Sequence, residues 1–120
     1  MAAAARRLIC PSANLVDGHR AFRFDVTNSQ GQTQAALALR YQGRVYAYLN
    51  ACRHIPVELD WQQDGNVFDI SGQYLVCSMH GAIYRPDNGV CAGGPCRGQK
   101  LVSLPVHEED GQVWLNVIEE

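Results

Sequence analysis

Short runs in which apolar and polar residues alternate dominate the chain. Segments 21–26 and 34–41 both follow this spacing of two, which is typical of half-buried β-strands. Gln42-Gly43 then predicts a tight turn, and 44–50 returns as a second strand to form a hairpin. The side chains of Ala35, Leu37, Leu39 and Tyr41 are expected on one face of the 34–41 strand.

A second hairpin is predicted near the end of the chain. Segments 100–106 and 112–117 have strand character, and they flank the run Glu108-Glu109-Asp110-Gly111. We expect this acidic run to be a solvated hairpin tip. Helical periodicity is weak throughout, so the pattern indicates an antiparallel all-β domain.

The middle of the chain, 51–99, differs from both hairpins. It holds four of the five cysteines and seven of the eleven glycines, with short strand pieces at 67–70, 74–77 and 82–84. The run 85–89 is typical of a turn. A loop-rich segment between two regular hairpins is interpreted as an insertion that binds a metal on a β base.

Length and charge narrow the function classes. A chain of 120 residues predicts a single domain over 1–120, and 47% apolar residues suffice for a modest core. Residues 1–60 carry seven Arg against four acids (+3), and 61–120 carry three basic residues against eight acids (−5), for a net charge of −2. This balance gives no reason to expect a nucleic-acid partner. No run reaches the roughly 18–20 apolar residues of a membrane helix, so no membrane partner is expected either.

The cysteine content suggests the compartment and the chemistry. Five cysteines are an odd number, and thiols in such numbers in a reducing compartment more often hold metal than form disulfides. Arg6-Arg7 has the form of a twin-arginine signal, but Pro11 interrupts the apolar stretch that such a signal needs. We therefore expect an exposed start before a first strand, in a cytoplasmic protein. Cys10 is expected to be a buried strand residue.

Two short stretches of the insertion carry the candidate chemistry. Cys52 and His54 form a C-x-H pair, and Cys77 and His80 form a C-x-x-H pair 22 residues later. Two thiolates and two imidazoles suit zinc or an iron–sulfur centre. Zinc sites of this composition usually pair Cys with Cys and His with His. Here each loop supplies one of each, which favours a [2Fe–2S] centre and leaves zinc as the alternative.

At this point the residues resemble the Rieske [2Fe–2S] family, in its small, stand-alone, ferredoxin-type form. His80-Gly81 followed by Tyr84 is similar to the second cluster loop of the family, and Gly94-Pro95-Cys96 to the loop that covers the cluster. Asp60-Trp61 and the stretch 89–98 also look like stand-alone members. The resemblance spans roughly 44–117.

The resemblance implies a fold, a cofactor and a ligand set. The fold would be an antiparallel β sandwich or barrel base with an inserted, loop-rich cluster-binding subdomain. One [2Fe–2S] cluster per chain would be held by Cys52 and Cys77 on the inner iron and by His54 and His80 on the outer iron, near the surface.

Departures from quinol-oxidising relatives indicate the subtype. Those proteins carry a disulfide between the cluster loops, and the matching positions here are Val57 and Met79. Ala82 stands where they have a serine that donates to a cluster sulfur, so we expect a low potential, roughly −150 mV or somewhat above. For Cys91 and Cys96 the resemblance and a reducing compartment favour free thiols, with a disulfide as the minority alternative.

The predicted function is one-electron transfer, from a reductase to an oxygenase or a related redox enzyme. The chain lacks a flavin or nicotinamide glycine fingerprint and paired catalytic acids, so no catalytic residue is assigned and an enzyme is not expected. The alternatives are an accessory subunit resembling the small subunit of nitrite reductases, and a structural zinc-binding interaction module. His19 and His107 lack nearby cysteines and are expected at the surface.

Overall fold

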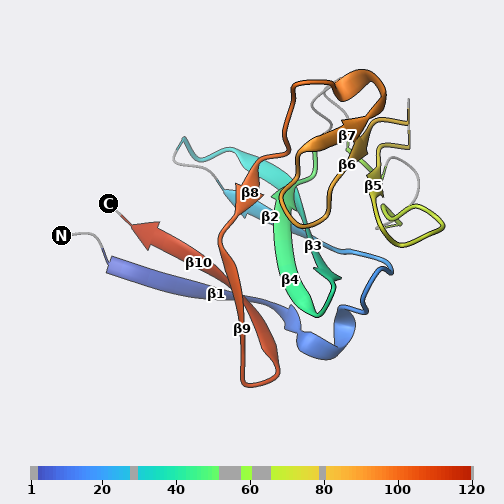
Figure 1. Cartoon of the computed structure of the whole chain (residues 1–120). Coiled ribbons are helices and arrows are strands. Elements are labelled where there is room, and N and C mark those ends of the chain that lie inside the picture. The colour runs from blue at the N-terminus through green and yellow to red at the C-terminus, as the bar shows by residue number, and fades with distance from the viewer. Residues whose placement is uncertain (1–2, 28–29, 52–57, 61–65, 79–80, 120) are drawn as a thin grey trace.

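The computed structural model describes residues 3–27, 30–51, 58–60, 66–78 and 81–119 of the chain. This part forms three antiparallel sheets, with short single turns of 3-10 helix as its only helical elements (Figure 1). The all-β class predicted from the alternating pattern is confirmed. None of the helical turns in this part of the chain has the length or apolar character to cross a membrane.

The first sheet joins the two ends of the described chain. Its strand order is β1 (Ala3–Pro11), β10 (Gln112–Glu119) and β9 (Val106–Glu109). Strands β9 and β10 form the predicted C-terminal hairpin around a two-residue turn, whose residues Asp110 and Gly111 have φ angles of 53° and 74°. Positive φ at both positions matches the right-handed twist of a hairpin and suits Asp-Gly.

Three boundaries differ from the sequence prediction. The first strand begins at Ala3, so the expected exposed start is already part of a sheet. The arm of the C-terminal hairpin begins at Val106, because Pro105 has no N–H for a ladder and separates it from 103–104. Glu108 and Glu109 are exposed, as expected of a solvated acidic run, but they lie within β9 and not in the turn. Each makes an ion pair with an arginine from another strand.

The second sheet contains the other predicted hairpin. Its order is β2 (Phe22–Thr27), β3 (Thr33–Tyr41), β4 (Arg44–Leu49) and β8 (Ser103–Leu104). The turn 42–43 has φ angles of 50° and 81°, as a two-residue hairpin turn requires. The prediction of a hairpin here is confirmed.

The strands of the third sheet come between β4 and β8 in sequence, inside the predicted insertion. It consists of β5 (Leu75–Val76), β6 (Ile83–Tyr84) and β7 (Cys91–Gly93), followed by the 3-10 turn η2 (Gly94–Cys96). The strands are short and the connections long, as the glycine-rich composition indicates. Figure 1 places this sheet at the upper right of the molecule, beside the second sheet and away from the chain ends.

Strand β3 contributes side chains to two hydrophobic cores, one on each of its faces. Leu37 and Leu39 face the insertion, as the alternation predicts, but Ala38 on the opposite face is also fully buried. The second face is covered because β1 and β10 pack against it through Cys10 and Val113. Burial of Cys10 in a strand is therefore confirmed. The buried residues between the second sheet and the insertion are Ala21, Leu37, Leu39, Tyr41, Tyr48, Leu59, Val67, Leu75, Cys77, Ala82, Tyr84, Cys96 and Leu101.

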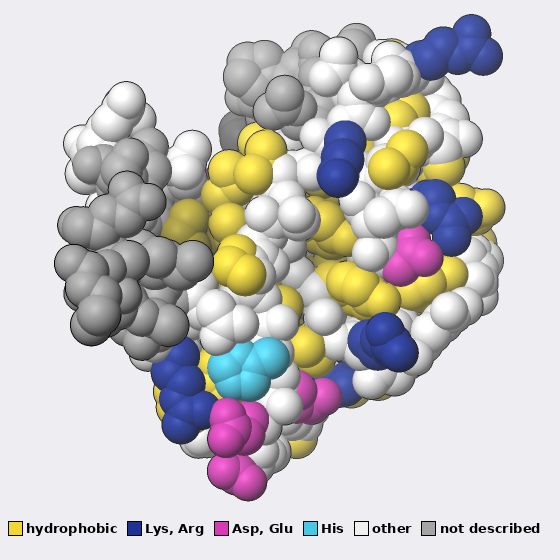
Figure 2. Space-filling model, turned by 60° about the vertical axis from the view of Figure 1, so that its left-hand side comes forward, with side chains coloured by type: hydrophobic (Ala, Val, Ile, Leu, Met, Phe, Trp, Pro, Cys, Tyr) yellow, Lys and Arg dark blue, Asp and Glu magenta, His cyan; other side chains and the backbone are white. Residues whose placement is uncertain are grey.

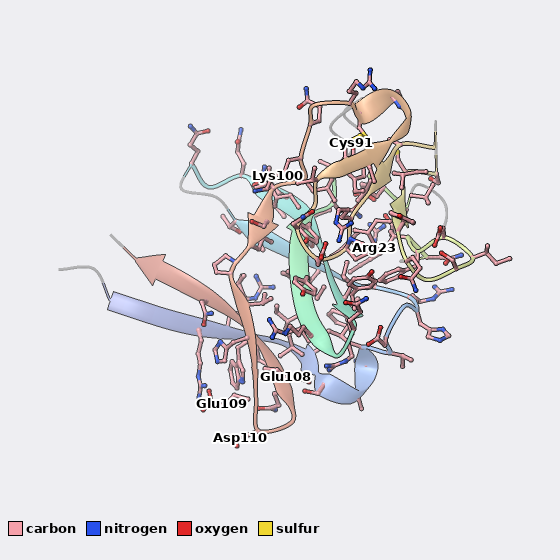
Figure 3. The ribbon with its side chains drawn as sticks, in the orientation of Figure 1. Arg23, Cys91, Lys100, Glu108, Glu109 and Asp110 are labelled. Atoms are coloured by element: carbon pink, nitrogen blue, oxygen red, sulfur yellow. A yellow bond between two sulfur atoms is a disulfide. The ribbon has the colours of Figure 1, made fainter. Side chains whose placement is uncertain are left out.

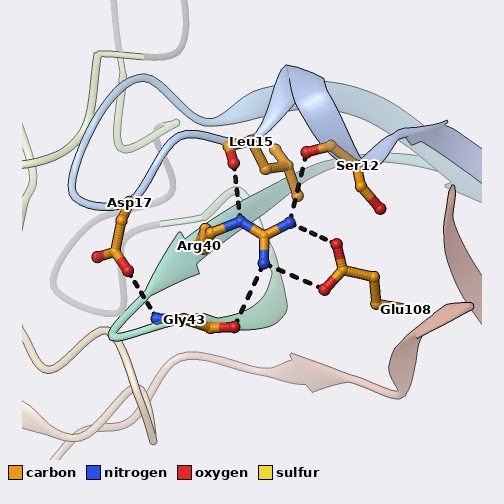
Figure 4. A network of polar contacts seen from close by, with 6 residues as sticks. All are labelled: Ser12, Leu15, Asp17, Arg40, Gly43 and Glu108. Atoms are coloured by element: carbon orange, nitrogen blue, oxygen red, sulfur yellow. Dashed lines mark hydrogen bonds and ion pairs between the residues drawn. The ribbon is translucent and has the colours of Figure 1, made fainter. Parts of the chain in front are cut away.

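Arg40, near the end of β3, connects the second sheet to the first sheet through an ion pair (Figure 4). Its Nη2 and Nη1 donate to both carboxylate oxygens of Glu108 in β9, at 2.5 and 3.1 Å. Its Nε donates to the carbonyl of Leu15 at 2.8 Å, and Nη2 also reaches the carbonyl of Ser12 in the 3-10 turn η1 (Ser12–Asn14). The Arg40 guanidinium lowers the pKa of Glu108 to about 2.

Charge on the surface is mixed. Figure 2 shows one face on which basic side chains are scattered and acidic side chains gather at the lower end, beside a histidine. His19 is exposed, as predicted. His107 is partly exposed, and its Nε2 lies 3.3 Å from the carboxylate of Glu109.

Candidate functional site

Of the four predicted ligands, the structure describes Cys77. Cys52, His54 and His80 lie outside the described residues. Cys77 directly follows β5, and only 1% of it is exposed. Among the described residues, no three His, Cys, Asp or Glu side chains form a group that could hold a metal ion. The site is therefore built here from the described segments that flank the predicted ligands.

The loop that contains the C-x-x-H pair is closed at its base. The amide of Cys77 donates to the carbonyl of Ala82 at 2.8 Å, and the amide of Gly81 donates to the carbonyl of Cys77 at 3.0 Å. Gly81 has φ 74°, a conformation that glycine adopts without steric cost. The two ends of the segment 77–82 are thus fixed beside each other.

The loop that contains the C-x-H pair is closed by a side chain. Asn50, at the end of β4, accepts a hydrogen bond from the amide of Leu59 at 2.7 Å and donates one to the carboxylate of Asp60 at 2.7 Å. Asn50 is itself buried. The segment between Asn50 and Leu59, which includes Cys52 and His54, therefore starts and ends at the same point of the base.

An ion pair between the buried Asp60 and the exposed Arg23 anchors this closure. Asp60 has no exposed surface, and its second carboxylate oxygen accepts a hydrogen bond from Nη1 of Arg23 at 2.6 Å. Arg23, in β2, also donates to Glu58 at 2.9 Å. The hydrogen bonds to Asp60 and Glu58 raise the pKa of Arg23. A buried carboxylate that lost these partners would be strongly destabilising, so the pair holds the end of the loop to β2.

The two loops are joined directly. The amide of Ser78, next to Cys77, donates to the carbonyl of Leu59 at 2.9 Å. This bond brings the end of the first loop against the start of the second. The pattern predicted two loops that face each other, and these flanking segments are in hydrogen-bond contact.

A third segment packs on the second loop. A Cβ placed on Gly94 in η2 would lie 2.9 Å from the carbonyl oxygen of Gly81 and 3.2 Å from Cα of Ala82. Gly94 also has φ 81°, so both space and backbone conformation require glycine there. The Gly94-Pro95-Cys96 segment thus covers the backbone that directly follows His80 in sequence.

The expectation of free thiols at Cys91 and Cys96 is wrong in this structure. The two residues form a disulfide across β7 and η2, with their Cα atoms 5.7 Å apart. The physical reason is the turn at 93–95, which folds the chain back so that residues five apart come within bridging distance. Sequence spacing does not predict this turn, because it depends on how Gly94 packs against the second loop.

The turn at 85–89 of the insertion is anchored to β4. The hydroxyl of Tyr48 in β4 donates to the carbonyl of Pro86 at 2.7 Å, inside the core. Burial raises the pKa of Tyr48, so its phenol stays protonated and remains a donor. Gly89 lies against this ring, where a Cβ would come within 2.9 Å of Tyr48 and 3.2 Å of Leu101. The turn at 85–89, predicted from sequence, is closed by a bond from the amide of Gly89 to the carbonyl of Arg85.

The described donors fit an iron–sulfur cluster. A thiol that is almost fully buried between Ala82 and the apolar core suits the thiolate of an inner iron, which is shielded from water. Gly81 and Gly94 leave no side chain between the second loop and its cover. Tyr84, which belongs to the stretch that resembles the second cluster loop of the family, is fully buried in the same core.

Sequence reasoning did not find the residues that close the first loop. Asn50 directly follows β4 and Arg23 lies in β2, at positions that have no distinguishing pattern, and Asp60 is marked in the sequence only as part of Asp60-Trp61. A carboxylate within an otherwise apolar Leu-Asp-Trp run is a weak signal of a buried, paired acid. Its partner comes from 37 residues earlier in the chain, which sequence alone does not indicate.

Comparison with known proteins places these features in context. A family model described as "Rieske [2Fe-2S] domain" matches residues 6–109. No curated protein sequence matches the chain.

Solved structures share the fold. A Sphingomonas yanoikuyae B1 ferredoxin is 23% identical, with a TM-score of 0.70, over 94% of this chain and 99% of that one. A chain from a complex of reduced oxygenase and oxidized ferredoxin in carbazole 1,9a-dioxygenase is also 23% identical, with a TM-score of 0.70, over 92% and 91%. A Mycobacterium tuberculosis protein described as the small subunit of an NADH-dependent nitrite reductase is 16% identical, with a TM-score of 0.68, over 98% and 99%. At these identities the matches establish a common fold.

Proposed function

Because the chain belongs to the Rieske [2Fe–2S] domain family, we propose that it is a one-electron carrier of the ferredoxin type. The observation that carries this proposal is the family match over residues 6–109, which contains both cysteine–histidine pairs. We assign no catalytic residue, and the chain acts as a redox component, not as an enzyme with its own substrate.

Four residues would hold one [2Fe–2S] cluster per chain. We propose Cys52 and Cys77 as the ligands of the inner iron, and His54 and His80 as the ligands of the outer iron. When bound, such a cluster supplies the uptake and release of a single electron. The buried position of Cys77 supports its assignment to the inner iron.

The surrounding residues would set the environment of the site. Asn50 and the Arg23–Asp60 pair hold the ends of the first loop, and the Leu59–Ser78 bond fixes it to the second. The cover at 94–96 excludes water from the backbone around Ala82, which is fully buried. Ala82 cannot donate a hydrogen bond from its side chain, which supports the expectation of a potential near the low end of the Rieske range.

The partners we propose are a reductase that supplies the electron and an oxygenase that receives it. The solved complex of an oxygenase with its ferredoxin supports this choice, because the chain matches nearly the whole of one component. The cytoplasm is the compartment that we propose, since an odd number of cysteines is unusual for a secreted disulfide scaffold. We propose further that residues 1–120 act as a single domain.

A second candidate is an accessory subunit of a larger oxidoreductase. The match that covers 98% of this chain and 99% of the nitrite reductase small subunit favours it. The two proposals differ in how tightly the chain binds its partner. A pull-down from the native host should recover a reductase and an oxygenase through weak, salt-sensitive contacts if the chain is a ferredoxin. A stable stoichiometric complex with one large redox subunit would instead support the accessory role.

Anaerobic purification tests the electron-carrier proposal directly. We expect a brown protein with two irons and two acid-labile sulfides per chain, and a rhombic electron paramagnetic resonance signal after reduction. His80→Ala should abolish the visible spectrum, and His107→Ala, which alters a histidine paired with Glu109, should leave it unchanged. Colourless protein with stoichiometric zinc would overturn the proposal and support the zinc-binding interaction module.

A further inference from the structure

The two cysteines of the Cys91–Cys96 disulfide differ in their exposure to solvent. Cys91 is partly exposed, whereas Cys96 is fully buried in the core between the insertion and the base. Cys91 lines a cavity of about 360 Å³ together with Gly93, Gly94 and Arg97. Figure 3 shows Cys91 at the top of the molecule, far from the first sheet. The bridge is thus approached from the Cys91 side.

The same loop also has acceptors ready for two thiols. Sγ of Cys96 lies 3.2 Å from the carbonyl oxygen of Gly93 and 3.5 Å from that of Ile83, and Sγ of Cys91 lies 3.5 Å from the carbonyl oxygen of Gly93. A disulfide has no hydrogen to donate, but a cysteine thiol is a weak donor. After reduction both thiols would find partners without a large movement, so the fold tolerates the bridged and the open form.

The ring that the disulfide closes contains the contact with the second ligand loop. Gly94 lies inside this ring, and it packs so closely on the second loop that a Cβ there would lie 2.9 Å from the carbonyl oxygen of Gly81. The amide of Gly81 closes the loop onto Cys77. A covalent constraint on 91–96 therefore acts on the backbone that follows the predicted ligand His80.

We propose that Cys91 and Cys96 form a reversible thiol–disulfide exchange site, whose state sets how tightly the segment 91–98 covers the second ligand loop. The reactant is a dithiol. Its thiolate attacks Sγ of Cys91 and forms a mixed disulfide, while Cys96 leaves and takes up a proton. The second thiol of the reactant then displaces Cys91, which is also protonated. Two electrons and two protons pass to the bridge, and the reactant becomes a cyclic disulfide.

The positive charge of Arg97 favours this direction of attack. Arg97 lines the same cavity as Cys91, and its guanidinium attracts an incoming thiolate. The reverse reaction, with an oxidised dithiol, restores the bridge with the same balance of atoms and electrons. The chemistry of exchange stands on the disulfide itself, and its effect on the cluster loop rests on the proposed function.

The exchange is tested on the full-length protein with dithiothreitol and its oxidised form at varied ratios. Free thiols are alkylated with a light reagent in the folded state. After denaturation and full reduction the remaining cysteines are alkylated with a heavy reagent, followed by peptide mass spectrometry. We expect Cys91 and Cys96 to change label together, in one reversible two-electron step. A pair that carries the heavy label at every ratio, and so never opens in the folded protein, would overturn the proposal.

The coupling to the ligand loop is tested by hydrogen–deuterium exchange of the peptide that contains Gly81 and Ala82. We expect about tenfold faster exchange in the open form, because the covalent constraint on the cover is lost. Cys91→Ser should show the fast rate in both buffers, since it cannot form the bridge. Cys10→Ala, which removes a buried thiol in β1, should respond to dithiothreitol as the unmodified protein does. Equal exchange rates in both buffers for the unmodified protein would overturn the coupling.

The visible spectrum separates this inference from the proposed function. Faster release of iron to a chelator in the open form, and in Cys91→Ser, is expected if the ligand loop holds the cluster. A colourless protein that still exchanges its bridge and its amides as described would overturn the proposed function and leave the exchange site intact. A brown protein whose bridge never opens would do the reverse.

Discussion

A carboxylate that loses all contact with solvent needs partners inside the protein, and Asp60 has two of known geometry. Arg23 satisfies one oxygen and Asn50 the other, which fixes the end of the loop that carries Cys52 and His54 in sequence. Arg23 lies in β2, and Asn50 directly follows β4. At this scale, the second sheet positions the described end of the loop.

Asp60→Asn tests this positioning role. The side-chain amide nitrogen of the new Asn would replace one carboxylate oxygen, so a donor of Arg23 or Asn50 would face another donor. The charge-assisted hydrogen bond to Arg23 would also be lost. We expect the free energy of unfolding to fall by about 2 kcal/mol, measured by chemical denaturation. Chelator-driven loss of colour should also become faster.

Asp25→Asn is the matched control, because Asp25 is an exposed carboxylate on the same strand as Arg23. Its effect on stability should stay within about 0.5 kcal/mol. Equal losses in both variants would contradict a special role for the buried carboxylate.

The residue scale also marks a limit of sequence reasoning. The C-x-H and C-x-x-H spacing was sufficient to propose ligands, because two donors within a few residues are rarely coincidental. The burial of Cys77 agrees with one of these assignments. Partners such as Arg23 leave no trace in local spacing, since the contact depends on how the loop returns to β2.

At the scale of elements, the cover at 94–96 packs so closely on the second loop that there is no room for a side chain at Gly94. Gly94→Ala would place a methyl group against the Gly81 carbonyl and the Ala82 backbone, neither of which is the end of a flexible side chain. We expect the cover to be displaced and the free energy of unfolding to fall by about 2–3 kcal/mol. Denaturation and the rate of colour loss measure the effect.

Gly98→Ala separates the contact from the backbone cost. Gly98 has a similar φ of 79°, but a Cβ there would meet nothing within 4 Å. We expect a loss of only about 1 kcal/mol from the left-handed conformation, with no change in colour loss. If both variants lose the same stability and lose colour at the same rate, the packing of Gly94 on the second loop does not contribute to holding the cluster.

Tyr48→Phe tests the attachment of the insertion to β4. The variant removes the hydroxyl that donates to the Pro86 carbonyl and leaves a buried acceptor without this partner. We expect the free energy of unfolding to fall by about 1–2 kcal/mol, with the ring still packed on Gly89. An unchanged stability would indicate that water replaces the hydroxyl.

The elements divide clearly into those that sequence predicts and those it does not. The hairpin at 42–43 follows from a two-residue turn between alternating strands, and the C-terminal hairpin follows from strand segments on either side of the run 108–111. The burial of both faces of β3 does not follow from the sequence. The alternation predicts a solvated second face, but the first sheet packs against that face and buries its alanine side chain at Ala38. The Cys91–Cys96 bridge likewise depends on a turn formed by tertiary packing.

At the scale of the whole molecule, the Arg40–Glu108 pair links the sheet of the chain ends to the sheet that supports the insertion. The pKa of Glu108 is about 2 in the folded protein and 4.5 as its ordinary value. Because the folded pKa is the lower one, the pair stabilises the protein above pH 4.5. This contribution is lost as the pH falls from 4.5 towards 2.

Glu108→Gln should therefore lower the free energy of unfolding at pH 7 by about 1 kcal/mol, since the carboxylate is partly exposed and screened by solvent. The difference from the unmodified protein should shrink steadily between pH 4.5 and 2. Asp110→Asn, in the exposed turn of the same hairpin, serves as control and should differ little at any pH. A difference for Glu108→Gln that stays constant with pH would contradict the ion pair.

The pairing of β1 with β10 has a practical consequence. Ala3 lies opposite Glu119, so both chain ends leave the same edge of the base, and Figure 1 shows them on the side away from the third sheet. A fluorescent reporter or an electrode tether fused at either terminus would therefore leave the cysteine-rich end facing outward. Two copies joined end to end by a short flexible linker would present both of those ends to the surroundings at once.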